Sequence, residues 1–120
     1  MHELSLVEGM MDIVRESASQ NNIYRVTRVK LVIGELTMAL PDSLRFAFAA
    51  LSQDELFNGA ELEIDQLRVI CRCEECGHEF KPGDNYIFLC PDCGNGRVVV
   101  VQGHELYLDS YEGDDASGPG

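Results

Sequence analysis

The chain is poor in basic residues and contains no long apolar segment. Only 9 of its 120 residues are Lys or Arg, against 21 Asp or Glu, so the formal net charge is −12. Such an acidic protein repels nucleic-acid phosphates, and the composition therefore excludes a DNA- or RNA-binding role. No apolar run approaches the roughly twenty residues that span a bilayer, so we expect no insertion into a membrane.

The sequence also lacks a segment that resembles a secretory signal. We therefore expect the protein to be cytoplasmic, in a reducing compartment where thiols stay reduced. Hydrophobic residues make up 45% of the chain, which indicates a globular protein and not a disordered one. A chain of 120 residues is long enough for one small hydrophobic core and an attached module that a bound metal stabilises.

Five cysteines lie close together in the second half of the chain. Cys73 and Cys76 form one Cys-x-x-Cys pair, and Cys90 and Cys93 form another after thirteen intervening residues. This spacing is typical of a structural zinc site with four thiolate ligands. Two disulfides are the alternative, which a reducing compartment disfavours. A closed four-thiolate zinc leaves no position for a hydrolytic water, and only three histidines are present, so we expect no enzymatic activity.

Two residues beside the cysteine pairs have more than one interpretation. Cys71 is either a substitute zinc ligand or a spare thiol at the end of a strand. The spare thiol is favoured because Cys71-x-Cys73 makes a poorer chelating turn than Cys73-x-x-Cys76. His78 is either a solvent-facing loop residue or a hydrogen-bond donor to a zinc thiolate.

The first three residues, Met1, His2 and Glu3, form a second candidate metal site. The bulky His2 disfavours removal of the initiator Met, so an α-amine, an amide and an imidazole lie next to one another along the chain. Together they form fused chelate rings that favour square-planar Ni(II) or Cu(II), to which Glu3 adds an oxygen. The alternative is an ordinary polar residue at a frayed terminus.

The hydrophobic pattern predicts an α+β fold: a small mixed sheet with two helices, plus an inserted zinc-ribbon module. The first helix is expected over residues 6–19, with Ser5 as N-cap and Glu8 completing a capping box. Met10 and Met11 of this helix are expected in the core. The remaining predicted elements are a helix over residues 41–51 and strands over residues 24–33, 61–65, 97–101 and 104–111.

The composition predicts three parts in the chain. Residues 1–69 are expected to form a nickel-binding α+β domain that the C-terminal strand 103–112 completes. Residues 70–102 are expected to form the zinc ribbon. Residues 113–120, which are acidic and rich in glycine, are expected to form a disordered tail.

Several motifs together resemble a known family. They are Met-His-Glu-Leu at residues 1–4, the segment Val26–Glu35, the two Cys-x-x-Cys pairs and the closing segment Gly103–Glu112. This combination is similar to the hydrogenase nickel-insertion accessory proteins, the HypA/HybF family. The likeness covers nearly the whole chain apart from its last eight residues.

The resemblance implies a metallochaperone and not an enzyme. Members carry Ni(II) to the large subunit of [NiFe]-hydrogenase together with a partner GTPase, and in some organisms they also serve urease maturation proteins. The family's nickel ligands correspond to the α-amine of Met1 and to His2, with Glu3 as the neighbouring acid. Its zinc ligands correspond to the two cysteine pairs. The alternative function is a zinc-ribbon adaptor between proteins with no nickel delivery of its own.

The chain departs from the family pattern at two places. Some members have an acidic residue near position 40 that helps to bind nickel, whereas this chain has Leu40-Pro41 followed by Asp42. The fourth nickel ligand is therefore open between Asp42, His104 and solvent. Some members also have a histidine beside each cysteine pair, whereas this chain has only His78.

Overall fold

The computed structural model describes residues 3–83 and 86–115, and this part of the chain forms two compact units. The first unit comprises residues up to Val32, Ala39–Asp65 and the chain from Tyr107, and the second comprises Ile33–Met38 and Gln66–Leu106. The elements, in chain order, are α1 (Glu3–Gln20), β1 (Ile23–Gly34), the 3-10 turn η1 (Glu35–Thr37), α2 (Pro41–Leu51), β2 (Glu61–Leu67), β3 (Ile70–Cys73), β4 (Glu79–Phe80), β5 (Val98–Gln102) and β6 (Leu106–Asp115). None of the described helices is long and apolar enough to cross a membrane.

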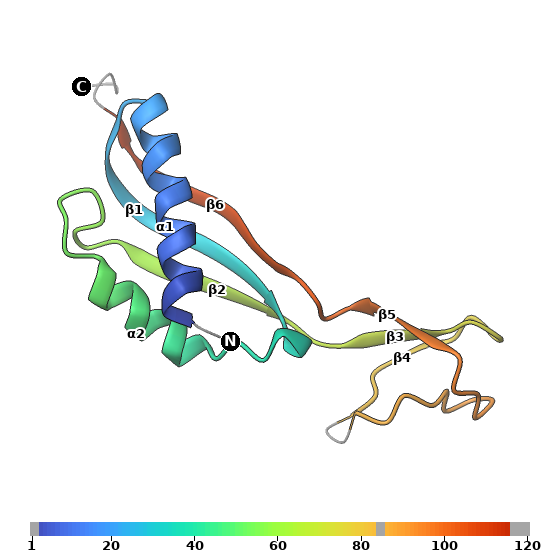
Figure 1. Ribbon diagram of the computed structural model, residues 1–120. Helices are drawn as coiled ribbons and strands as arrows, with labels where there is room; N and C mark the ends of the chain where they lie inside the picture. The colour runs from blue at the N-terminus through green and yellow to red at the C-terminus, as the bar shows by residue number, and fades with distance from the viewer. Residues whose placement is uncertain (1–2, 84–85, 116–120) are drawn as a thin grey trace. The chain divides into compact units, whose positions relative to one another are not determined.

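The first unit is built on the sheet β2-β1-β6, with β1 in the centre. Figure 1 shows α1 lying across this sheet with α2 beside it. The two helices pack against each other. On β1 the buried residues are Val26, Val29 and the four consecutive residues from Leu31 to Gly34. The core includes Met10 and Met11 of α1, as the sequence predicts, together with Val29 and Leu31 of β1. The α+β class with two helices is confirmed.

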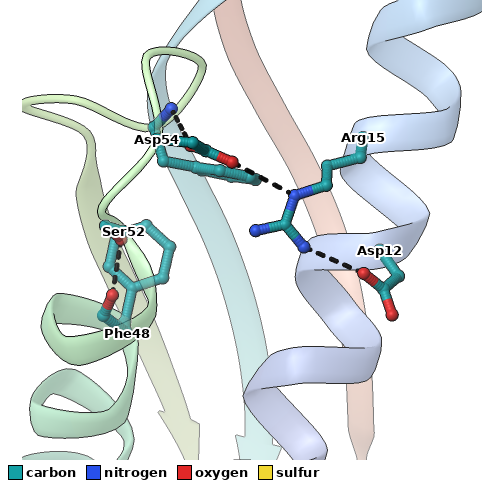
Figure 2. Close-up of polar contacts among 6 residues, drawn as sticks. Asp12, Arg15, Phe48, Ser52 and Asp54 are labelled. Carbon is teal, nitrogen blue, oxygen red and sulfur yellow. Dashed lines mark hydrogen bonds and ion pairs between the residues drawn. The ribbon is translucent and has the colours of Figure 1, made fainter.

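A polar contact joins α1 to the loop that follows α2. The Arg15 guanidinium contacts Asp12 at 2.8 Å and Asp54 at 3.4 Å, as Figure 2 shows. The same group lies 5.1 Å from the ring centre of the buried Phe57. Because these charged side chains are partly exposed, the contact positions the loop more than it stabilises the fold.

The predicted start of the first helix is wrong. The helix begins at Glu3, so Ser5 lies inside its first turn and is not an N-cap. The carboxylate of Glu3 lies in the first turn, where a negative charge is favourable beside the positive end of the helix dipole. Val7, in the second turn of the helix, is fully buried in the core.

The second unit is built on the antiparallel sheet β4-β3-β5. Cys71 pairs with Phe80 of β4 and with Val100 of β5, while Cys73 pairs with Val98. A small buried cluster lies on this sheet and consists of Val69, Cys71, Cys73, Phe80 and Cys90. Three of its five members are cysteines, and partly buried apolar side chains such as Phe88 and Val100 pack against them.

A close backbone contact closes the second unit where β1 ends. The Gly34 N–H donates to the Glu105 carbonyl at 2.7 Å, and the Leu36 N–H donates to the Gly103 carbonyl at 2.9 Å. A Cβ on Gly34 would lie 2.1 Å from the Gly103 oxygen. Glycine is therefore required at position 34 because any Cβ would overlap the neighbouring backbone, and not because the residue has an unusual backbone angle.

The last strand differs from its predicted bounds. β6 begins at Leu106 and not at residue 104, because Gly103 adopts φ +132° and its N–H donates to the Glu105 side chain. It then runs to Asp115, three residues into the segment predicted as a disordered tail. A Cβ on Gly113 would lie 2.4 Å from the carbonyl oxygen of Arg25, so glycine there permits close pairing with β1. The rest of that tail, residues 116–120, lies outside the described residues.

Candidate metal centre

The first cysteine pair lies on a tight turn at the end of β3. The Gly77 N–H donates to the Cys73 carbonyl at 2.9 Å, and the Cys73 N–H donates to the His78 carbonyl at 2.9 Å. Gly77 has φ +77°, a left-handed conformation that glycine adopts without steric cost. The turn directs the side chains of Cys73 and Cys76 toward the same point.

The second pair repeats this backbone arrangement without a flanking strand. The Gly94 N–H donates to the Cys90 carbonyl at 2.8 Å, and the Cys90 N–H donates to the Asn95 carbonyl at 3.0 Å. Gly94 has φ +71°. The same local rule therefore forms both turns, which is why the spacing of the cysteines predicts them well.

The structure brings the sulfur atoms of all four paired cysteines within 4.8 Å of one another. The Sγ atoms of Cys73 and Cys93 are 3.6 Å apart, and those of Cys76 and Cys90 are 3.5 Å apart. All five cysteines lie in the described part of the chain and are free, so the disulfide alternative is not supported. Four thiols around one point are the donor set of a structural zinc site, and the residues fit that metal.

The environment of the four sulfurs favours deprotonation of one cysteine and disfavours deprotonation of others. The backbone N–H of Cys76 lowers the pKa of Cys73 to about 7. At Cys76 the backbone N–H of His78 acts in the same direction. Hydrogen bonding with Cys90 and loss of solvation outweigh it and raise the pKa of Cys76 to about 12. A bound divalent cation overcomes the cost of deprotonating the other thiols, because a coordinated thiol loses its proton.

Cys71 lies outside the group of four sulfurs, in agreement with its interpretation as a spare thiol. It is fully buried among the members of the second unit's apolar cluster. Loss of solvation raises the pKa of its thiol, so the side chain stays protonated and packs as a small apolar group.

A polar bridge between the two turns was not predicted from the sequence. The Nδ1 atom of His78, after the first pair, lies 3.2 Å from a carboxylate oxygen of Asp92, inside the second pair. The His78 ring also stacks on Phe80, with ring centres 6.3 Å apart. His78 is thus a partly exposed residue that joins the two turns, and its contact with Asp92 depends on a fold that local spacing does not reveal.

A second polar contact anchors the start of the zinc-binding segment. The Glu35 carboxylate accepts hydrogen bonds from the Val69 N–H and from the Tyr86 hydroxyl, both at 2.9 Å. These bonds, with the nearby Arg68, lower the pKa of Glu35. The sequence analysis assigned no role to Glu35. Its position directly after Gly34, where the predicted strand ends, could have indicated a carboxylate that accepts hydrogen bonds from another segment.

The proposed nickel ligands Met1 and His2 lie outside the described residues. Glu3 is described, and it lines a groove of about 430 Å³ together with the first turn of α2. Asp42 lines the same groove, so the structure brings this candidate fourth ligand to the start of α1. His104 belongs to the other unit.

Comparisons with known proteins point to one family. A family model described as hydrogenase/urease nickel incorporation, metallochaperone, HypA matches residues 1–113. The hydrogenase maturation factor HypA of Moorella thermoacetica is 42% identical over 114 residues, which cover 95% of this chain and 100% of that protein. The corresponding factor of Desulfitobacterium hafniense is 43% identical over 113 residues, which cover 93% of this chain and 97% of that protein. The solution structure of the nickel metallochaperone HypA from Helicobacter pylori matches with a TM-score of 0.64 and 29% identity, over 96% of this chain and 99% of that one.

Proposed function

Because the chain belongs to the HypA family of nickel-incorporation metallochaperones and hydrogenase maturation factors, we propose that it carries Ni(II) at its N-terminus. It delivers this ion, with a partner GTPase, to the large subunit of [NiFe]-hydrogenase, and urease maturation proteins are a second class of client. The observation that supports the proposal is the groove at the start of α1 that Glu3 and Asp42 both line.

The chemistry of the nickel site follows from its donors. The α-amine of Met1, the amide of His2 and its imidazole offer three nitrogens in sequence, which suit square-planar Ni(II). The groove supplies carboxylate oxygens from Glu3, which follows these residues in the chain, and from Asp42. Nickel is the cargo here, so moderate affinity and an exposed site suit the task better than a closed cage.

Zinc has a different role in this proposal. Cys73, Cys76, Cys90 and Cys93 hold it in the second unit, where two of these cysteines also belong to the buried cluster. Four protein thiolates leave zinc no open position for a substrate, so the protein acts as a carrier and not as a catalyst. The free thiols require the reducing conditions of the cytoplasm.

The proposal is tested by titrating Ni(II) into zinc-loaded protein with and without a short extension ahead of Met1. The extension converts the α-amine into an amide and removes one chelating nitrogen, so we expect one Ni(II) per chain to bind the unextended protein much more tightly. Isothermal titration calorimetry measures both affinities. Equal affinities would contradict the terminal site and favour the zinc-ribbon adaptor.

Asp42→Asn should weaken nickel binding on the order of tenfold, because it replaces a carboxylate at the groove with a poorer oxygen donor. The side chain of Asp42 is fully exposed and contacts Arg45 only at 3.8 Å, so the fold should not change. Glu16→Gln is the matched control, since it removes one acid from α1 about 20 Å along the helix from Glu3. Equal nickel affinities for the two variants would assign the fourth position to solvent or to His104.

A further inference from the structure

A pocket of about 160 Å³ lies in the second unit beside Glu35. The exposed side chains of Arg68 and Lys81 line it, together with the buried Val69 and the half-buried Tyr86. None of these residues is one of the four paired cysteines, and none lines the groove at Glu3. The pocket is therefore not accounted for by the zinc or by the nickel.

The two bases of this pocket have no direct counter-charge, in a chain where acids are in excess. The chain has 21 Asp and Glu residues against 9 Lys and Arg residues. Four of the arginines form ion pairs, namely Arg15, Arg28, Arg45 and Arg97. Neither Arg68 nor Lys81 forms an ion pair with another residue that the structure describes. Two cations thus line one pocket and are available to an anion from outside.

Glu35 brings one negative charge to the pocket, but other groups hold its carboxylate. Its two oxygens accept hydrogen bonds from the Val69 N–H and the Tyr86 hydroxyl, both at 2.9 Å. These bonds lower the pKa of Glu35, and the positive charge of Arg68 adds a smaller effect in the same direction, so the carboxylate is ionised at neutral pH. Two cations and one carboxylate leave the pocket with a net charge of +1.

The wall of the pocket includes a strained residue. Tyr86 has φ +51°, a left-handed conformation that residues with bulky side chains rarely adopt. The hydrogen bond from its hydroxyl to Glu35 holds the ring in place. Strained backbone of this kind is concentrated at binding sites, where the surrounding structure maintains it. Val69 and Pro82 add apolar surface beside the ring, so the pocket combines two cations with an apolar part.

We propose that this pocket binds a monocarboxylate with a short aliphatic chain, with the carboxylate between Arg68 and Lys81. This inference goes beyond nickel delivery and does not depend on it. One carboxylate matches the net charge of +1, whereas a phosphate group carries about −1.5 to −2 at pH 7 and exceeds it. Arg68 offers a planar fork of N–H donors and Lys81 a compact ammonium group, and the aliphatic chain packs on the apolar part of the pocket.

An NMR titration of the full zinc-loaded chain with butyrate tests the site. Butyrate replaces chloride at constant ionic strength, and we expect saturable shifts of the Val69 and Gly83 amides with a dissociation constant in the millimolar range. Inorganic phosphate should bind more weakly than butyrate. A second arm uses N-acetylglutamic acid α-amide, whose one carboxylate is on a side chain. Binding as tight as that of butyrate identifies an acidic side chain of a partner protein as a source of the carboxylate, and weaker binding identifies a free acid.

Lys81→Gln should raise the dissociation constant for butyrate at least about threefold, because it removes one of the two cations at a partly exposed site. Arg72→Gln is the matched control, since it removes one positive charge from an exposed position of the same unit that does not line the pocket, and it should leave the constant unchanged. Unchanged amide shifts away from the substituted residue show that each variant is folded. The proposal is overturned if butyrate shifts the amides no more than chloride does, if Lys81→Gln binds butyrate as tightly as Arg72→Gln, or if phosphate binds more tightly than butyrate.

Discussion

Cys90→Ala should release the zinc and unfold the second unit while the first unit keeps its structure. Cys90 is 2% exposed and belongs both to the group of four sulfurs and to the buried cluster of its unit. Three of the five buried members of that cluster are cysteines, so we expect the bound metal to supply a large part of the folding free energy of this unit. Structural zinc contributes about 10–16 kcal/mol in small zinc-binding peptides, more than such a unit can lose.

Two measurements detect the expected loss of zinc and of structure in the second unit. Metal analysis should find less than one zinc per chain, and amide hydrogen exchange should show lost protection across β3, β4 and β5. Both helices belong to the first unit, so the helical signal in circular dichroism should change little. A protected second unit that retains one zinc per chain would contradict the assignment of Cys90 as a ligand.

Cys71→Ala is the matched control for this prediction. It removes a thiol of the same buried cluster that lies outside the group of four sulfurs. The loss of one buried sulfur should cost about 1 kcal/mol, and the zinc content should stay at one per chain. The contrast between the two variants separates ligation from packing.

The parts of the structure that the sequence predicts depend on local rules. Each cysteine turn is closed by hydrogen bonds among six consecutive residues, with glycine at the position that needs a positive φ, so the spacing contains the necessary information. The buried Leu44, Ala47 and Phe48 of α2 follow from helical periodicity in the same way. The clustering of the four thiols is therefore a reliable inference from sequence.

The parts that the sequence does not predict depend on contacts between distant segments. Glu35 meets Val69 and Tyr86 only after the chain has folded, and Asp42 meets the groove beside Glu3 only because α2 packs against α1. No local pattern encodes these distances. The same cause explains the tail, where pairing with β1 overrides an acidic, glycine-rich composition as far as Asp115.

His2→Ala should lower the affinity for Ni(II) by at least about a hundredfold while zinc content and fold stay unchanged. The imidazole is the side-chain nitrogen that can close a chelate ring with the backbone nitrogens before it. Without it, Glu3 and Asp42 remain as oxygen donors, which select weakly for nickel over the harder cations. In cells, the variant should give nickel-poor hydrogenase that added nickel partly restores.

His104→Ala is the matched control for the loss of the imidazole. It removes an exposed histidine that belongs to the second unit, so it should leave both the nickel affinity and the hydrogenase nickel content at the native level. A nickel affinity that falls for both variants would make His104 the fourth ligand. An affinity that is unchanged in His2→Ala would instead exclude the N-terminal site, because none of the described residues that line the groove provides a side-chain nitrogen.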